Sequence, residues 1–260
     1  MILGKIVAHK RREVAGQREK IPVADMERLI AGLPPCRRLR NVLHKPGEVS
    51  LIAEIKRSSP SKGVIRPSFE PEKIARIYAG AGAAAISVLT DTGFFGGHPD
   101  YISLVHRETS LPVMRKDFII DPYQVYESRF LGSDAILLIA AILSDRELRS
   151  FQKLAFEMGL TCLVEAHTRT ELERALDSGA SLIGINNRDL NTFETDLTTT
   201  FRLRQYITDS SIVVVSESGI NSRSHMLALA GHEVDAALVG EALMGSDDIE
   251  AKVKELLGVL

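Results

Sequence analysis

The sequence contains few cysteines and no long apolar run, and both absences exclude classes of protein. Cys36 and Cys162 are too few for a disulfide framework or a structural zinc site. No stretch approaches the roughly 18 consecutive apolar residues that a transmembrane helix needs. The N-terminal segment MILGKIVAHKRREV lacks the apolar core and cleavage site of a signal peptide. We therefore expect a reduced, cytoplasmic protein without membrane contact.

An excess of charge of one sign is also lacking. The 260 residues include 32 Lys and Arg against 34 Asp and Glu, which gives a formal net charge of −2. This near balance argues against nucleic acid as a partner. At 45% hydrophobic residues, the chain is long enough for one large α/β domain.

What the chain does contain is eight short apolar runs rich in Val, Ile and Leu, each closed by a polar cluster. Their nearly continuous apolar character predicts strands that are covered on both faces, as in a parallel sheet. The runs span residues 51–56, 83–90, 112–119, 135–140, 161–167, 182–189, 212–219 and 236–241.

Helix-like segments separate these runs. PEKIARIYAG begins with Pro71 in its first turn, and SDRELRSFQKLAFEMG has an N-cap candidate at Ser144 and a stop at Gly159. In TRTELERALDSG, Thr168 is the candidate cap and Glu171 follows three residues later, as in a capping box.

Eight strand–helix units predict a (β/α)₈ TIM barrel, which typically has about 250 residues. A doubly wound sheet is the alternative, but no GxGxxG follows the first strand. Residues 1–47 contain no such strand, and IPVADMERLIAGLP reads as an amphipathic helix ended by Gly32. We expect one domain over 1–260, with a helical extension (1–47) across one end of the barrel (48–260).

Charged and polar residues stand at the carboxyl ends of five runs, where barrel enzymes have their active sites. Residues two apart share a strand face, so these pairs can point into the barrel together. A mutually satisfied polar layer, or side chains beneath the helices, would be the structural alternative. The pairs are Glu54 and Lys56, Lys116 and Phe118, Glu165 and His167, Asn186 and Arg188, and Glu217 and Gly219.

Two glycines near the end of the chain favour a phosphate site. Ser218 and Gly219 stand immediately before one expected helix, and Gly240 stands before another. Helix N-termini carry free N–H groups and partial positive charge, and phosphate sites after strands seven and eight are frequent in these barrels. We expect the Glu241 side chain to point away while its N–H serves the phosphate. Ser59–Pro60–Ser61 would turn the chain over the same side.

Metal and aromatic signals are weaker. The seven histidines form no HExxH set, and Glu165 with His167 would supply only two ligands, so we expect no metal. In TDTGFFGGH, glycines surround Phe94 and Phe95. Either ring could lie over a substrate or pack beneath the loop.

Taken together, the segments resemble the indole-3-glycerol-phosphate synthase family of tryptophan biosynthesis. They occur in the family's order over residues 50–245, with small departures at Met114, Ala166 and His98. The matching segments are IAEIKRSSPSKG, ISVLTDTGFFGG, MRKDFIIDPYQVYESR, AILLI, LVEAHT, IGINNRDLNTFETD, SESGI and LVGEALM.

The resemblance implies ring closure of carboxyphenylamino-deoxyribulose phosphate to indole-3-glycerol phosphate, with loss of CO₂ and water and without a cofactor. Lys116 would be the acid that protonates the ribulose carbonyl oxygen. Glu165 would help to expel the hydroxyl and remove the ring proton. Lys56 and Arg188 would hold the substrate carboxylate, and Glu54 would tune a lysine and share in proton transfer.

The resemblance also assigns the remaining pocket residues. Asn186 would orient substrate hydroxyls, and Glu217 would hold a lysine or a hydroxyl. The monofunctional enzyme would be a monomer or weak homodimer. Its ring pocket would be formed by Phe95, Phe118, Leu137, Leu190 and Leu238, and its phosphate site by Ser59, Pro60, Ser61, Ser218, Gly219, Gly240 and Glu241.

Two other functions remain open from the residues themselves. One is another phosphosugar barrel, either a metal-dependent epimerase or an aldolase that forms a Schiff base at Lys116. The second is a barrel that binds a phosphate ligand without catalysis.

Overall fold

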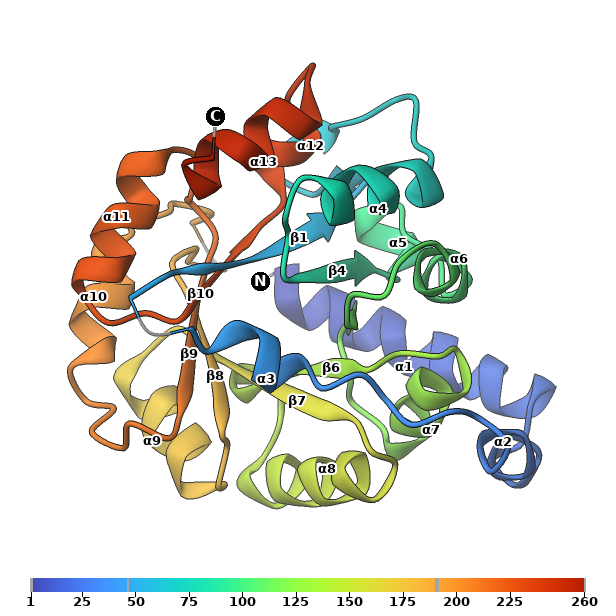
Figure 1. Cartoon of the computed structure of the whole chain (residues 1–260). Helices are drawn as coiled ribbons and strands as arrows, with labels where there is room; N and C mark the ends of the chain where they lie inside the picture. The colour runs from blue at the N-terminus through green and yellow to red at the C-terminus, as the bar shows by residue number, and fades with distance from the viewer. Residues whose placement is uncertain (1, 46, 190–191, 260) are drawn as a thin grey trace.

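Eight parallel strands close into a barrel in a computed structural model, which describes residues 2–45, 47–189 and 192–259 (Figure 1). Around the barrel the order is β1-β10-β9-β8-β7-β6-β5-β4, and β4 pairs with β1. The (β/α)₈ prediction is therefore confirmed. The strands are β1 (Ser50–Ile55), β4 (Ala85–Leu89), β5 (Val113–Lys116), β6 (Ala135–Ile139), β7 (Thr161–Ala166), β8 (Leu182–Asn186), β9 (Val213–Glu217) and β10 (Ala236–Val239).

Alternation along each strand separates the barrel interior from the layer beneath the helices. On β1, Leu51 and Ala53 pack outward in the cluster under the helices, whereas Ile52 packs inward with Leu163 and Val215. All six β1 residues are buried, as expected for a strand covered on both faces. Glu54 shares the inward face with Ile52, so its charge enters the barrel near the carboxyl end.

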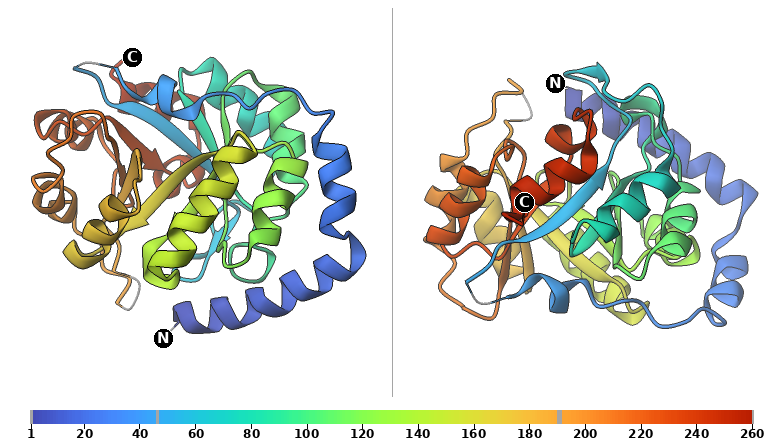
Figure 2. Two further views of the ribbon diagram at one scale, coloured as in Figure 1. Left: turned by 90° about the horizontal axis from the view of Figure 1, so that it is seen from below. Right: turned by 45° about the horizontal axis from the view of Figure 1, so that its top comes forward.

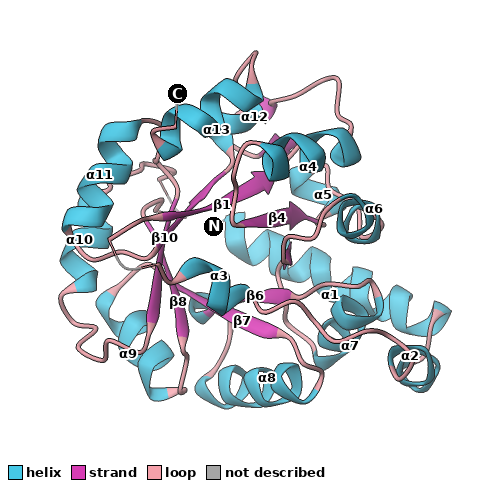
Figure 3. Cartoon of the chain, in the orientation of Figure 1, coloured by secondary structure: helices cyan, strands magenta, loops and turns pink. Residues whose placement is uncertain are grey.

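Helices surround the strands on the outside (Figure 3). Pro71 occupies the first turn of α4, and Ser144 forms a reciprocal capping box with Glu147. Thr168 caps α9 as predicted. The Glu171 side chain, however, accepts a hydrogen bond from the backbone N–H of His167 and not from that of Thr168. The helices after β1 are α4 (Pro71–Gly80), α5 (Thr92–Phe95), α6 (Tyr101–Glu108), α7 (Pro122–Phe130), η1 (Ala140–Ile142), α8 (Asp145–Glu157), α9 (Arg169–Asp177), α10 (Thr198–Arg204), α11 (Arg223–Gly231), α12 (Glu241–Met244) and α13 (Ile249–Leu257).

The N-terminal extension covers both ends of the barrel, not one end as predicted. Helix α1 (Ile2–Lys20) runs along one end, α2 (Val23–Ile30) lies beside the barrel, and α3 (Leu39–Leu43) lies at the other end (Figure 2). Leu39 and Leu43 of α3 pack into the barrel interior from the amino ends of the strands. None of the described helices is long and apolar enough to cross a bilayer.

A short antiparallel hairpin follows β1. It pairs β2 (Ser58–Ser59) with β3 (Gly63–Val64). This hairpin brings Ser59 and Ser61 to the carboxyl end of the barrel, where both line the main pocket.

Buried ion pairs hold α1 against the barrel. Lys10 is fully buried, and its Nζ lies 2.9 Å from Asp117 Oδ1, 3.0 Å from Glu13 Oε2 and 3.1 Å from Asp91 Oδ2. Asp117 Oδ2 in turn lies 2.9 Å from Arg115 Nη2. Burial alone would lower the pKa of Lys10, but the charges of Asp117, Asp91 and Glu13 raise it well above its ordinary value.

Candidate active site

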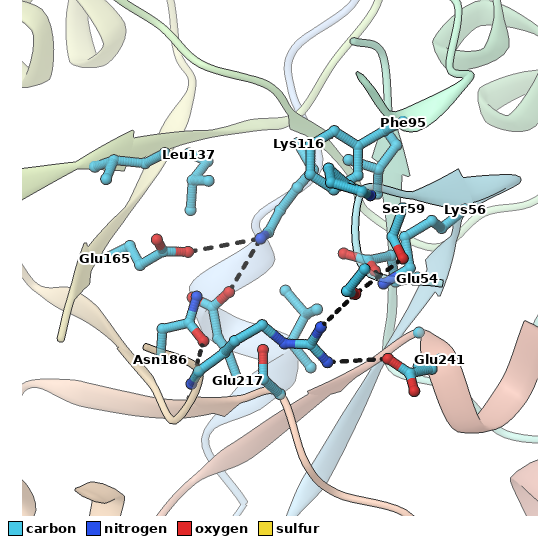
Figure 4. Close-up of a pocket in the computed structure, with 18 of the residues that line it drawn as sticks. Glu54, Lys56, Ser59, Phe95, Lys116, Leu137, Glu165, Asn186, Glu217 and Glu241 are labelled. Carbon is cyan, nitrogen blue, oxygen red and sulfur yellow. Dashed lines mark hydrogen bonds and ion pairs between the residues drawn. The ribbon is translucent and has the colours of Figure 1, made fainter. Parts of the chain in front are cut away.

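One pocket opens at the carboxyl ends of the strands (Figure 4). All the catalytic and binding residues assigned from the sequence line it, except Leu190, which lies outside the described residues. His167, expected to point inward with Glu165, lines a neighbouring cavity instead. The pocket therefore brings together these residues: Glu54, Lys56, Ser59, Pro60, Ser61, Phe95, Lys116, Phe118, Leu137, Glu165, Asn186, Arg188, Glu217, Ser218, Gly219, Leu238, Gly240 and Glu241.

Lys116 reaches into the middle of this pocket from the end of β5. Its Nζ lies 3.3 Å from Glu217 Oε2 and 3.6 Å from Glu165 Oε2, as the dashed lines in Figure 4 show. Burial alone would lower the pKa of Lys116, but the negative charges of Glu217, Glu165 and Glu54 outweigh burial and raise it. Lys116 is therefore a buried ammonium group that faces the pocket.

Glu217 is the buried carboxyl group whose pKa is raised. Burial raises its pKa to about 8, the nearby Glu165 and Glu54 add to the increase, and Lys116 opposes it. Neither Glu217 oxygen has a hydrogen bond from the described residues. Gly184 on β8 leaves room for this side chain, because a Cβ at position 184 would lie 2.1 Å from Glu217 Oε1.

Glu54 and Lys56 form a second acid–base pair on the other side of the pocket. Glu54 Oε1 lies 2.8 Å from Lys56 Nζ. Burial alone would raise the pKa of Glu54, yet the charges of Lys56 and Lys116 lower it below its usual value. The surroundings of the pocket thus push the pKa values of these two carboxyl groups in opposite directions, down for Glu54 and up for Glu217.

Arg188 and Glu241 form an ion pair at the mouth of the pocket. Arg188 Nη2 lies 2.9 Å from Glu241 Oε2, and Arg188 Nη1 donates to Ser61 Oγ at 3.0 Å. Lys62 Nζ lies 3.4 Å from the other oxygen of Glu241. The expectation that the Glu241 side chain points away was therefore wrong, because two cations hold it at the pocket.

The proposed phosphate end is built differently from the sequence expectation. Ser218 and Gly219 both have left-handed backbone conformations, with φ of 68° and 80°. They do not directly precede a helix, since α11 begins at Arg223 and is capped by Ser222. Gly240 does precede one, as the N-cap residue of the four-residue helix α12.

The apolar side of the pocket combines predicted and unpredicted residues. Phe95 and Phe118 lie with ring centroids 6.0 Å apart, and Leu137 and Leu238 line the same pocket. Helix α1 covers part of the pocket, and this contact was not predicted from the sequence. Its only signal was apolar spacing at the start of an otherwise charged segment, in Ile2, Leu3 and Ile6.

His, Cys, Asp and Glu side chains are the usual protein ligands of metal ions. Within residues 2–45, 47–189 and 192–259, no three of them lie where they could hold an ion. Glu165 and His167 do lie together, but as an ion pair of 3.4 Å between Oε1 and Nε2.

The fold and the site define a TIM-barrel enzyme, because carboxyl and ammonium groups converge in a pocket at the carboxyl ends of its strands. The family model for indole-3-glycerol phosphate synthase matches residues 3–256. The chain therefore belongs to the indole-3-glycerol phosphate synthase family, which consists of carboxy-lyases of tryptophan biosynthesis.

Similar proteins support this membership. A relative from Desulforamulus reducens is 48% identical over 257 residues, which are 99% of this chain and 97% of the relative. One from Dehalococcoides mccartyi is 50% identical and covers 99% and 100% of the two chains. Both bear the name indole-3-glycerol phosphate synthase.

Solved structures are similar in fold alone. A 3-hexulose-6-phosphate synthase has a TM-score of 0.66 at 15% identity, over 82% of this chain and 100% of the other. The tryptophan synthase complex of Pyrococcus furiosus has a TM-score of 0.61 at 18% identity, over 83% and 99% of the two chains.

A first prediction concerns Gly240. A Cβ at this position would lie 2.2 Å from Glu54 Oε1, so Gly240→Ala must push the carboxylate away from Lys56. We expect kcat to fall about tenfold, together with a higher KM, because displacing a reacting group by about 1 Å impairs its alignment. Steady-state kinetics would measure both constants.

Gly231→Ala is the matched control, since nothing lies within 4 Å of the Cβ it would add. If Gly240→Ala had the same kcat as the control, the close packing of the Glu54 carboxylate against Gly240 would not matter for the reaction.

Proposed function

We propose that Lys116 and Glu165 close the indole ring of carboxyphenylamino-deoxyribulose phosphate by general acid–base catalysis. The observation that carries this proposal is the position of the Lys116 ammonium group, between Glu165 and Glu217 inside the pocket. The reaction needs an acid next to a carbonyl oxygen and a second proton-transfer group beside it. Lys116 at the end of β5 and Glu165 on β7 meet these two requirements, because their side chains face each other inside the pocket.

In the first stage, the carboxylate-bearing ring carbon attacks the ribulose carbonyl carbon. The electron pair of the C=O bond moves to oxygen, which takes a proton from Lys116. The bond to the carboxylate then breaks, its electrons restore the aromatic ring, and CO₂ leaves. The neighbouring carboxyl groups favour the protonated form of Lys116, so the acid is ready before the attack.

In the second stage, the new hydroxyl leaves as water and the indole forms. The Glu165 carboxylate removes the proton whose loss completes the indole double bond, and the carboxylic acid so formed gives that proton to the departing hydroxyl. Because the carboxylate departs as neutral CO₂, each turnover consumes one proton in total. Glu217, whose pKa is raised, lies on the other side of Lys116 and is placed to return a proton to it.

Cations and glycines would hold the two negative ends of the substrate. Lys56 and Arg188 suit the carboxylate, and the Ser61, Ser218 and Gly240 loops converge on the phosphate end. Arg188 forms its ion pair with Glu241, so we propose that the substrate carboxylate takes the place of the Glu241 carboxylate on this guanidinium. Asn186 accepts from the N–H of Arg188 through Oδ1, which leaves its amide nitrogen for a substrate hydroxyl.

The test is incubation with carboxyphenylamino-deoxyribulose phosphate while indole fluorescence is followed. The chain contains no tryptophan, so the background is low. We expect fluorescence to rise with the parent protein and to rise at least about a hundredfold more slowly with Glu165→Gln, which removes the titrating group but keeps its size.

The same assay separates the other functions. Loss of turnover with EDTA, or covalent trapping by borohydride at Lys116, would favour an epimerase or an aldolase instead. Equal, negligible turnover by the parent protein and Glu165→Gln would favour a barrel that only binds its ligand.

A further inference from the structure

His167 lies directly behind Glu165, just outside the main pocket. It follows β7, and its side chain is only 10% exposed. Its Nε2 atom lies 3.4 Å from Glu165 Oε1, and its Nδ1 atom lies 3.2 Å from Glu171 Oε2. The backbone N–H of His167 also donates to Glu171 Oε2 at 2.8 Å. The same carboxylate oxygen therefore contacts both the ring and the backbone of His167.

Both ring nitrogens of His167 therefore face carboxylate oxygens. A neutral imidazole has one N–H and one lone pair, so it would turn a lone pair toward one of the two carboxylates. The imidazolium form offers an N–H to each. In agreement, burial alone would lower the pKa of His167, but the hydrogen bond with Glu171 and the charges of Glu165, Glu171 and Glu217 raise it above the usual value.

Glu165 is consequently held from two sides. Its Oε2 atom lies 3.6 Å from Lys116 Nζ, while its Oε1 atom lies 3.4 Å from His167 Nε2. The Nε2 atom is buried and makes no hydrogen bond with any described group, so its contact with Glu165 Oε1 is that of an ion pair. No other cation is paired with Glu165 Oε1 among the described residues.

We infer that His167 is a positioning residue, which fixes the Glu165 carboxylate through the contact between Nε2 and Oε1 so that it can remove a proton from the substrate. This inference rests on the proposed role of Glu165. His167 lies too far back to line the main pocket, and acts through Glu165. It lines a neighbouring cavity together with other charged groups, namely Arg11, Glu171, Arg188, Asp189, Glu194, Asp196 and Arg202.

The test is the pH dependence of kcat/KM for His167→Gln and His167→Leu. Without a positive charge beside the Glu165 carboxylate, we expect the acid limb of the profile to move to higher pH by at least about one unit, the smaller end of the effect of a close opposite charge. Above the limb, we expect kcat/KM to stay within about tenfold of the parent value.

Glu171→Gln is a matched control on the far side of the ring. It keeps an oxygen for the two N–H donors but removes the charge that favours the imidazolium. We expect the limb to move in the same direction by a smaller amount. A role of His167 in folding alone would lower the melting temperature and reduce kcat/KM equally at every pH, without moving the limb.

An unmoved acid limb in both His167 variants would overturn the inference. So would a parent-like limb in His167→Gln alone, because Gln retains an N–H donor but carries no charge. Failure of the proposed function is distinguishable, since Glu165→Gln would then keep normal turnover whatever the His167 variants do.

Discussion

Replacing Lys116 with Met is expected to lower kcat by at least about a hundredfold, the smaller end of the range for a general acid. Methionine has a similar length and fills the same space, but it has no proton to give to the carbonyl oxygen. It also leaves Glu165 and Glu217 facing each other without the shared ammonium group, which lies 3.6 and 3.3 Å from them. The loss of a proton donor and the loss of the intervening charge act in the same direction.

The measurement is single-turnover and steady-state kinetics by indole fluorescence, with substrate binding followed by calorimetry. We expect binding to persist, because the proposed carboxylate and phosphate contacts come from other strands. Lys62→Met is a matched control that removes the same charge at the pocket rim, where the side chain is 60% exposed. It should affect KM more than kcat. A Lys116→Met variant with near-normal kcat would remove Lys116 from the acid role.

The barrel and the composition of its pocket could be predicted because both depend on local patterns. Near-continuous apolar runs predict parallel strands, and residues two apart share a face, so Glu54 and Lys56 could be assigned to the inside before any contact was known. Parallel strands that form one barrel present all their carboxyl ends at one rim. The sequence positions of Lys116, Glu165 and Glu217 therefore already implied that they meet there.

What could not be predicted depends on partners that are distant in the sequence. The Glu241 side chain turns toward the pocket because Arg188, 53 residues earlier, reaches it across the mouth. No local pattern specifies such a pair. Ser218 likewise adopts a left-handed conformation in a loop, and α11 begins only at Arg223. The order strand, glycine, helix in the sequence does not show how many loop residues lie between the glycine and the helix.

The contacts of helix α1 with the barrel could not be predicted for a related reason. Charged residues are frequent in its second half, so apolar spacing is clear only near its start. Ion pairs attach it to the barrel in addition to the buried side chains of Ile6 and Val14. Lys10 reads as an ordinary surface lysine in the sequence, yet it is fully buried among carboxylates from two strand ends. Buried charge of this kind becomes visible only once both partners are in place.

Lys10→Met is accordingly expected to lower the free energy of unfolding by about 3–5 kcal/mol, the usual cost of removing one partner of a buried ion pair. Asp91 Oδ2 is buried and has no hydrogen bond from the described residues, so the ammonium group 3.1 Å away is what compensates its charge. Asp117 would keep Arg115 as a partner, and Glu13 is partly exposed. The substitution therefore leaves Asp91 as the buried carboxylate that loses the most stabilisation.

Urea denaturation would measure this loss, with Lys5→Met as the control, because Lys5 is an exposed lysine on the same helix. The control should change the free energy of unfolding by less than about 0.5 kcal/mol. A loss below about 1 kcal/mol for Lys10→Met would mean that water or a shift of α1 compensates Asp91. Because Ile2, Leu3 and Ile6 of α1 line the pocket, release of the helix should also raise KM, which links a buried ion pair outside the pocket to substrate binding inside it.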